Sequence, residues 1–107
     1  MSAPIADFNT RAHYSATISS TAVAVATVVT SAAHRGKASR AIIQAKGATL
    51  AWRSDVGGAT VTPTNGFHLP DTQYFVVLGN ESIKALQFIR ASGTDVTLVI
   101  ALEWIGD

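Results

Sequence analysis

Basic side chains are concentrated in one part of the chain. Five of them fall within a stretch of 19 residues that contains no acid: Arg35, Lys37, Arg40, Lys46 and Arg53. Such a cluster is typical of contact with an acidic surface, either nucleic acid or a negatively charged patch on a protein. A nucleic-acid site also needs aromatic side chains for base stacking, and this stretch offers only Trp52. A protein partner is therefore favoured over nucleic acid, but the simplest interpretation is a solvated hairpin edge protected by cations.

Histidines and carboxylates do not form a motif. His13, His34 and His68 are scattered over the N-terminal segment and the loops. Metal ligands can converge in space from distant positions, but solvated or interface histidines are the simpler interpretation. Most acids fall in predicted turns, where a short carboxylate caps backbone N–H groups. The sequence also lacks a nucleophile elbow, a phosphate-binding loop and a zinc-protease motif, so we expect no metal, no cofactor and no enzymatic activity.

Two tryptophans are the large anchors of the sequence. Trp52 and Trp104 are more typical of a core or a subunit interface than of a ligand site. Trp104 ends the last predicted strand, where half-burial at an interface is plausible. The residues that we expect to contact a partner combine these aromatic and basic features: Phe8, Tyr14, Arg35, Lys37, Arg40, Arg53 and Trp104.

The composition indicates one small folded domain with an unusually uncharged surface. The chain has 107 residues, 48% of them hydrophobic, 14% charged, with a net charge of +1. This balance excludes intrinsic disorder, which needs low hydrophobicity and high charge. A solvated monomer normally carries more charge, so part of the surface is expected to lie against another protein. The absence of cysteine excludes disulfides and thiolate metal sites. We also expect no membrane span and no signal peptide.

The elements that must position these side chains are predicted to be strands. Alternating apolar and polar residues, rich in Val, Thr and Ile, follow an N-terminal arm at 1–13 that is expected to be loose. The run at 73–78 is almost wholly apolar, which predicts a strand buried on both faces, and 81–86 is compatible with a short helical turn. Turn signals separate seven or eight short strands, so the single domain at 14–107 is predicted to be an all-β sandwich or barrel. The predicted strands are 15–20, 22–30, 39–44, 48–53, 67–69, 73–78, 85–90 and 96–104.

Three stretches together resemble a known group of proteins. They are Arg40 to Ala48 followed by Trp52-Arg53, then Thr60 to Pro70 with Pro63-Thr64-Asn65-Gly66, and finally Ile83 to Ile89 followed by Ala91 to Val96. Their order is similar to that in small β-sandwich structural proteins of tailed bacteriophages, namely capsid decoration (cement) proteins and head-spike base proteins. The similarity spans about residues 40–103 and rests on hairpin and turn patterns.

The resemblance implies a jelly-roll-like sandwich in a non-enzymatic virion component. It further implies a homotrimer that contacts the major capsid protein or other virion proteins. A cement protein is expected to be made in the host cytoplasm and to stabilise the assembled head by binding it. The N-terminal arm is expected to order against a neighbouring subunit, with contacts from Phe8 and from Tyr14 just after the arm.

Other functions remain open at this point. One is a tail, neck or fibre-attachment protein of the virion. Another is a carbohydrate-binding adsorption module, which would need an exposed aromatic such as Trp52, Phe67 or Tyr74 beside Asp55 or Asp71. A nucleic-acid-binding barrel and an enzyme are weaker alternatives.

Overall fold

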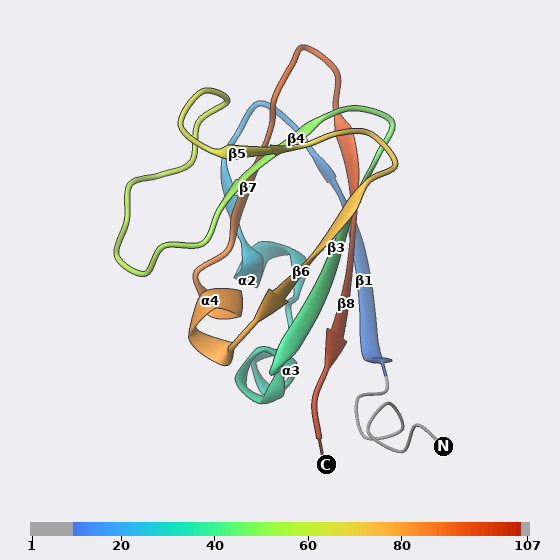
Figure 1. Ribbon diagram of the computed structural model, residues 1–107, viewed down its shortest axis with the longest axis vertical. Coiled ribbons are helices and arrows are strands. Elements are labelled where there is room, and N and C mark those ends of the chain that lie inside the picture. The colour runs from blue at the N-terminus through green and yellow to red at the C-terminus, as the bar shows by residue number, and fades with distance from the viewer. Residues whose placement is uncertain (1–9, 106–107) are drawn as a thin grey trace.

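Eight strands form two four-stranded antiparallel sheets in the computed structural model, which describes residues 10–105 (Figure 1). The strand order is β1-β8-β3-β6 in the first sheet and β2-β7-β4-β5 in the second. Successive strands alternate between the sheets except at β4 and β5, and this order is that of an eight-stranded jelly roll. The predicted all-β sandwich is confirmed. The strands are β1 (Thr10–Ile18), β2 (Val23–Ala24), β3 (Arg40–Lys46), β4 (Leu50–Arg53), β5 (Phe67–Leu69), β6 (Tyr74–Leu78), β7 (Gln87–Arg90) and β8 (Val96–Glu103).

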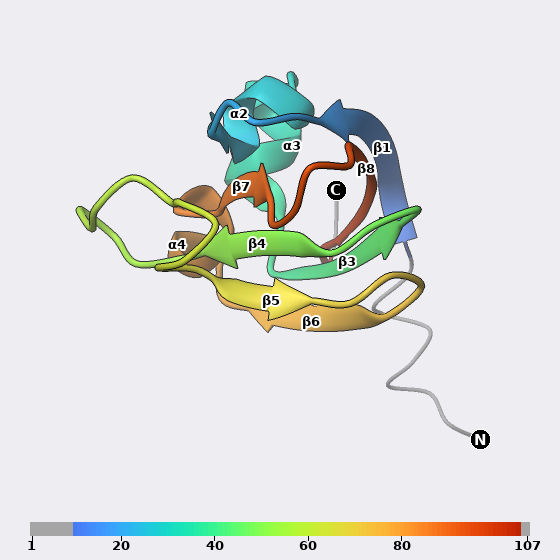
Figure 2. The same ribbon diagram turned by 90° about the horizontal axis from the view of Figure 1, so that it is seen from above.

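The core lies between the sheets because apolar residues occupy alternate positions along the central strands. On β3, Ala41, Ile43 and Ala45 are fully buried, and the residues between them are partly exposed. The β8 side chains from Val96 to Ile100 follow the same period of two. Phe88 of β7 is the largest side chain that is fully buried in this core. Figure 2 shows β4 and β5 of the second sheet lying over β3 and β6 of the first.

An aromatic contact joins the sheets at one side of the sandwich. The Trp52 ring on β4 stacks on the Phe75 ring of β6, with centroids 4.1 Å apart and an angle of 14° between the planes. Phe67 of β5 lies opposite Trp52 in the β4–β5 ladder, and their ring centroids are 5.2 Å apart. Trp52 is therefore packed between two rings, the partly buried inner ring of Phe75 and the exposed outer ring of Phe67.

The outer faces of the two sheets differ. On the second sheet, Val61 from the loop between β4 and β5 is buried against Ala51 and Ile89, and its N–H donates to Gln87 Oε1 at 3.0 Å. On the first sheet, several apolar side chains of the outer face remain exposed among the described residues. Exposed apolar surface of this kind marks contact sites.

Within residues 10–105, three short helices replace structure that the sequence predicts as strand or turn. They are α2 (Val25–Val28), α3 (Ala32–Lys37) and α4 (Asn80–Lys84). The predicted strand 22–30 is wrong after Ala24: Val25 and Val28, three residues apart, bury one face of α2, and Val25 N–H donates to Leu86 O at 2.9 Å. Burial of that face overrides the β propensity of the segment. The turn expected at 34–37 belongs to α3, whereas the helical turn considered at 81–86 corresponds to α4.

Two further expectations need correction. Strand β1 begins at Thr10, so residues 10–13 belong to the sheet and not to the predicted arm, because they pair with the end of β8. Strand β6 is not buried on both faces: it is an edge strand, and Tyr74, Val76 and Leu78 are exposed. A continuous apolar run in the sequence does not by itself distinguish a central strand from an exposed edge strand.

No helix among the described residues is long and apolar enough to cross a membrane.

Candidate partner-binding surface

Trp104 is the centre of the surface where the predicted partner residues gather. It follows β8 and packs beside Arg11 of β1 and His34 of α3, at the end of the sandwich where β1 begins and β8 ends (Figure 1). We define the Trp104 end as Arg11, Tyr14, His34, Lys37 and Trp104. The tryptophan is only 8% exposed, so most of its ring is already fixed by the fold before any partner binds.

His34 connects Tyr14 to Trp104. The Tyr14 hydroxyl lies 2.5 Å from His34 Nδ1, and the His34 ring centroid lies 5.5 Å from that of Trp104. Helix α3 holds His34 in place, since the Ser31 hydroxyl accepts a hydrogen bond from the His34 N–H at 3.2 Å. The sequence did not single out His34, because its partners Tyr14 and Trp104 are 20 and 70 residues away.

Two cations lie over the indole. The Arg11 guanidinium carbon is 6.0 Å from the centre of the Trp104 ring, and Lys37 Nζ is 5.8 Å from it. Both distances allow a cation–π attraction. Neither cation forms an ion pair with a carboxylate among residues 10–105. Both side chains are exposed.

The Trp104 indole N–H has no hydrogen-bond acceptor among the described residues, although the nitrogen is buried. Leaving a buried donor unsatisfied costs about 1–3 kcal/mol.

Arg35 and Arg40 flank the Trp104 end but are engaged in the fold. Arg35 Nη1 donates to Val29 O at 2.5 Å, which ties α3 to the end of α2. Arg40 forms an ion pair and a hydrogen bond with the buried carboxylate of Glu103 on the neighbouring strand. Both remain partly exposed and extend the basic character of this end.

Arg53 does not belong to this surface. It lies on β4 of the other sheet, where Nε and Nη2 donate to the Asp55 carboxylate at 2.9 and 2.8 Å. This hydrogen bonding raises the pKa of Arg53 and lowers that of Asp55. The basic stretch of the sequence is thus divided between distant parts of the fold. Phe8 lies outside the described residues.

A second exposed surface was missed by the sequence analysis. Tyr74, Val76 and Leu78, which we call the β6 strip, are 66%, 46% and 68% exposed on the outer face of the first sheet. Beside the strip is a shallow depression of about 460 Å³ lined by His13, Ile42, Gln44, Tyr74, Val99 and Ala101. The sequence feature that could have indicated this surface is the lack of charged residues in β6, which is unusual for an edge strand.

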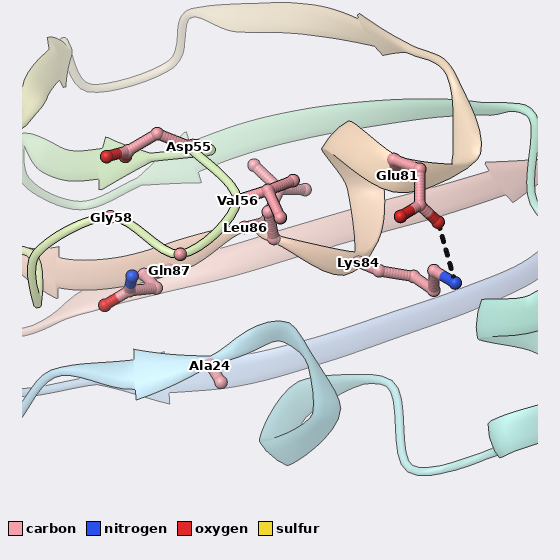
Figure 3. A pocket seen from close by; sticks show the side chains of 10 residues that line it. Ala24, Asp55, Val56, Gly58, Glu81, Lys84, Leu86 and Gln87 are labelled. Atoms are coloured by element: carbon pink, nitrogen blue, oxygen red, sulfur yellow. Dashed lines mark ion pairs between the residues drawn. The ribbon is translucent and has the colours of Figure 1, made fainter.

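Two other depressions lie around the loop after β4. One, of about 460 Å³, brings exposed Phe67 beside Asp55, with Trp52, Arg53, Ser54 and Asn65. The other, of about 330 Å³, lies between this loop and α4 (Figure 3). Of its two carboxylates, Glu81 is paired with Lys84 at 2.9 Å and Asp55 with Arg53 at 2.8 Å, and no histidine or hydroxyl side chain lines it. Within residues 10–105, no three histidine or acidic side chains are grouped closely enough to hold a metal ion.

Comparisons with known proteins give no match: no family model, no curated protein and no solved structure is detectably similar to this chain.

Proposed function

We propose that this protein is a non-enzymatic structural subunit of a virion, and specifically a capsid decoration protein that binds the assembled head. The proposal draws on the resemblance of three sequence stretches to small phage head proteins. The jelly-roll order of the strands is compatible with it, since viral capsid domains often use this fold, although lectins and enzymes share it.

One observation carries the proposal: two exposed cations, Arg11 and Lys37, lie over the ring of Trp104 and lack an ion-pair partner among the described residues. Cations held over a fixed indole suit a carboxylate on an acidic protein surface. The rigid packing of Trp104 against His34 lowers the entropy cost of binding. Because the contact forms only on the assembled shell, each bound copy stabilises the shell by RT ln(1 + [L]/Kd), where [L] is the free protein concentration.

The test has two steps. Particles are purified by density gradient from a culture that carries the gene, and the chain is quantified in separated heads and tails. Many copies per head support the proposal. Absence from heads, or presence only in tails, overturns it in favour of a tail, neck or fibre-attachment role.

The second step examines the surface itself. Lys37→Ser removes one of the cations over Trp104. The variant is expected to bind heads from which this protein has been removed about tenfold more weakly, because a cation is lost from a desolvated contact. Lys46→Ser, at the far end of β3, is the matched control and should bind like the wild type. Equal binding by both variants would place the contact elsewhere.

A second candidate function has its own observation. The carbohydrate-binding alternative requires an exposed aromatic beside an acid, and Phe67 and Asp55 line one depression. Phe67→Ala would then abolish binding in a titration with host-surface glycans, whereas Val56→Ala, on the same loop system but outside this depression, would not. No binding of glycans by the wild type removes this candidate.

A further inference from the structure

Strand β6 differs from the other three edge strands in having nothing that prevents pairing. The edge strand β1 carries Arg11 and His13 and has an irregular register near its start, and such features discourage a second strand. On the second sheet, β2 has two residues, and β5 has three and is followed by Pro70. The five residues of β6 are all apolar or aromatic and contain no charge and no proline.

The hydrogen bonds at both ends of β6 define which backbone groups point to the open edge. Gly79 N–H donates to Ser39 O at 3.0 Å, and Ala45 N–H donates to Gln73 O at 3.2 Å, so Gln73 and Gly79 face β3. Antiparallel pairing alternates, so Phe75 and Val77 also face β3. The N–H and C=O groups of Tyr74, Val76 and Leu78 therefore point away from the sheet. These are the same three residues whose side chains form the exposed β6 strip.

We propose that two copies of this protein pair β6 with β6 in antiparallel orientation about a two-fold axis that passes through Val76. In this register Val76 lies opposite Val76 of the second copy, and Tyr74 lies opposite Leu78 of the second copy. All three outward-facing residues then form hydrogen-bonded pairs, giving about six new backbone hydrogen bonds. The inference goes beyond the proposed function, because the contact does not depend on which particle the protein binds.

The register is self-complementary in its side chains as well. Each aromatic ring of Tyr74 meets a Leu78 side chain, and this contact removes apolar surface of both from water. No like charges face each other across the axis, since β6 carries none. The joined sheets would form one eight-stranded sheet, with the β6 strips of both copies at its centre and the depression lined by Ile42 and Val99 on either side.

The available area sets the expected strength. The three side chains of the β6 strip expose on the order of 300 Å² per copy, taking about 200 Å² for a fully exposed aromatic side chain. The pair would bury at most about 600 Å² of side-chain surface, which is less than the 1,200–2,000 Å² of a standard stable interface. A second copy is therefore expected to bind weakly, with a dissociation constant on the order of 10–100 µM. This contact makes a dimer, whereas the resemblance to phage head proteins implies a trimer.

The absence of native cysteine makes cross-linking a clean test. In Val76→Cys the two cysteines meet at the axis with Cα atoms about 5.5 Å apart, which is within disulfide range. Oxidation at about 100 µM is expected to give a covalent dimer with V76C. Thr17→Cys, exposed on β1 of the same sheet, is the matched control and should remain mostly monomeric. Equal dimer yields for the two variants would overturn the proposal.

The register has its own test. Tyr74→Cys and Leu78→Cys should each cross-link poorly alone, because four residues separate each cysteine from its own copy across the axis, about 14 Å along the strand. A mixture of the two variants should give the heterodimer. Cross-linking of Y74C with itself in preference to the mixture would overturn this register.

Sedimentation equilibrium tests the contact without cysteines. The wild type is expected to change from monomer to dimer over about 5–500 µM, and Val76→Lys to remain monomeric with an unchanged thermal midpoint. A wild-type trimer, or a monomer at every concentration, contradicts the proposal. Lys37→Ser should still dimerise, so a failure of head binding and a failure of dimerisation are distinguishable.

Discussion

Arg40 and Glu103 face each other across the β3–β8 ladder and form an ion pair on the outer side of the first sheet. The Glu103 residue is only 4% exposed, whereas the Arg40 side chain keeps 34% of its surface in solvent. A buried carboxylate needs compensation, because desolvation opposes its charge. The pair therefore joins β3 to β8 next to the Trp104 end.

Arg40→Met is expected to lower the free energy of unfolding by about 2 kcal/mol. Breaking a fully buried pair costs about 3–5 kcal/mol, and the partial exposure of Arg40 reduces that figure. Urea denaturation of the purified variant measures the change. Lys46→Met, at the exposed end of the same strand, should alter stability by less than about 0.5 kcal/mol. Equal stability of the two variants would show that the ion pair does not stabilise the fold.

The stack of Trp52 on Phe75 predicts a large effect from the inner ring and a small effect from the outer ring. Phe75→Ala removes a partly buried ring that stacks at 4.1 Å, and is expected to cost about 3 kcal/mol. Phe67→Ala removes a ring that is 70% exposed, and should cost less than about 1 kcal/mol. Thermal unfolding at low protein concentration measures both. A larger loss of stability in Phe67→Ala than in Phe75→Ala would mean that the exposed Phe67 ring contributes more to the packing of Trp52 than Phe75 does.

Gly79, between β6 and α4, has a φ of +95°, and a Cβ atom there would meet no other atom within 4 Å. Gly79→Ala is therefore expected to cost about 1–2 kcal/mol from backbone strain alone. Gly93 also has open space but does not lie in the positive-φ region. Gly93→Ala should be neutral or slightly stabilising, by up to about 1 kcal/mol. Chemical denaturation compares the two, and identical values would contradict the assigned conformation of Gly79.

The Arg53–Asp55 pair predicts a pH dependence. The side-chain hydrogen bond from Arg53 lowers the pKa of Asp55 below its ordinary value, and partial desolvation opposes the shift. Since the folded pKa lies below the unfolded one, the pair stabilises the fold above the unfolded pKa. That stabilisation is lost as the pH falls through the folded value.

Arg53→Gln is accordingly expected to raise the pKa of Asp55 toward about 3.9, as measured by NMR titration of its carboxyl carbon. Arg90→Gln breaks a separate ion pair with Asp95 and should leave Asp55 unchanged. Gly58→Ala offers a second approach, because a Cβ atom there would lie 1.5 Å from Asp55 Oδ2 and displace the carboxylate. An unchanged Asp55 pKa in both R53Q and G58A would show that the hydrogen bond from Arg53 does not lower the pKa of Asp55.

Much of the fold could be predicted from the sequence because its signal is local. The alternation in β3 and β8 identifies strands and their buried faces, and turn residues such as Lys46-Gly47 mark where the chain reverses. These signals gave the number of strands and the sandwich class. The helices were harder, because α2 is formed by valines that favour strands until tertiary packing buries one face of the turn.

The candidate surfaces were predicted only in part. Composition singled out Tyr14, Lys37 and Trp104, which the structure brings together, but not His34, which connects two of them. Arg53 belonged to the same basic stretch and lies on the other sheet, paired with Asp55. Proximity in sequence did not become proximity in space, because a jelly roll sends successive strands to opposite sheets.

Short alternating strands around an apolar core follow from local sequence, because side-chain period and turn chemistry act over a few residues. The edge position of β6 and the two cations over Trp104 follow from the three-dimensional arrangement of the strands. Both properties depend on which strands pair, and pairing is decided by contacts between residues far apart in the chain. The sequence of an apolar strand looks the same whether the strand lies inside a sheet or at its edge.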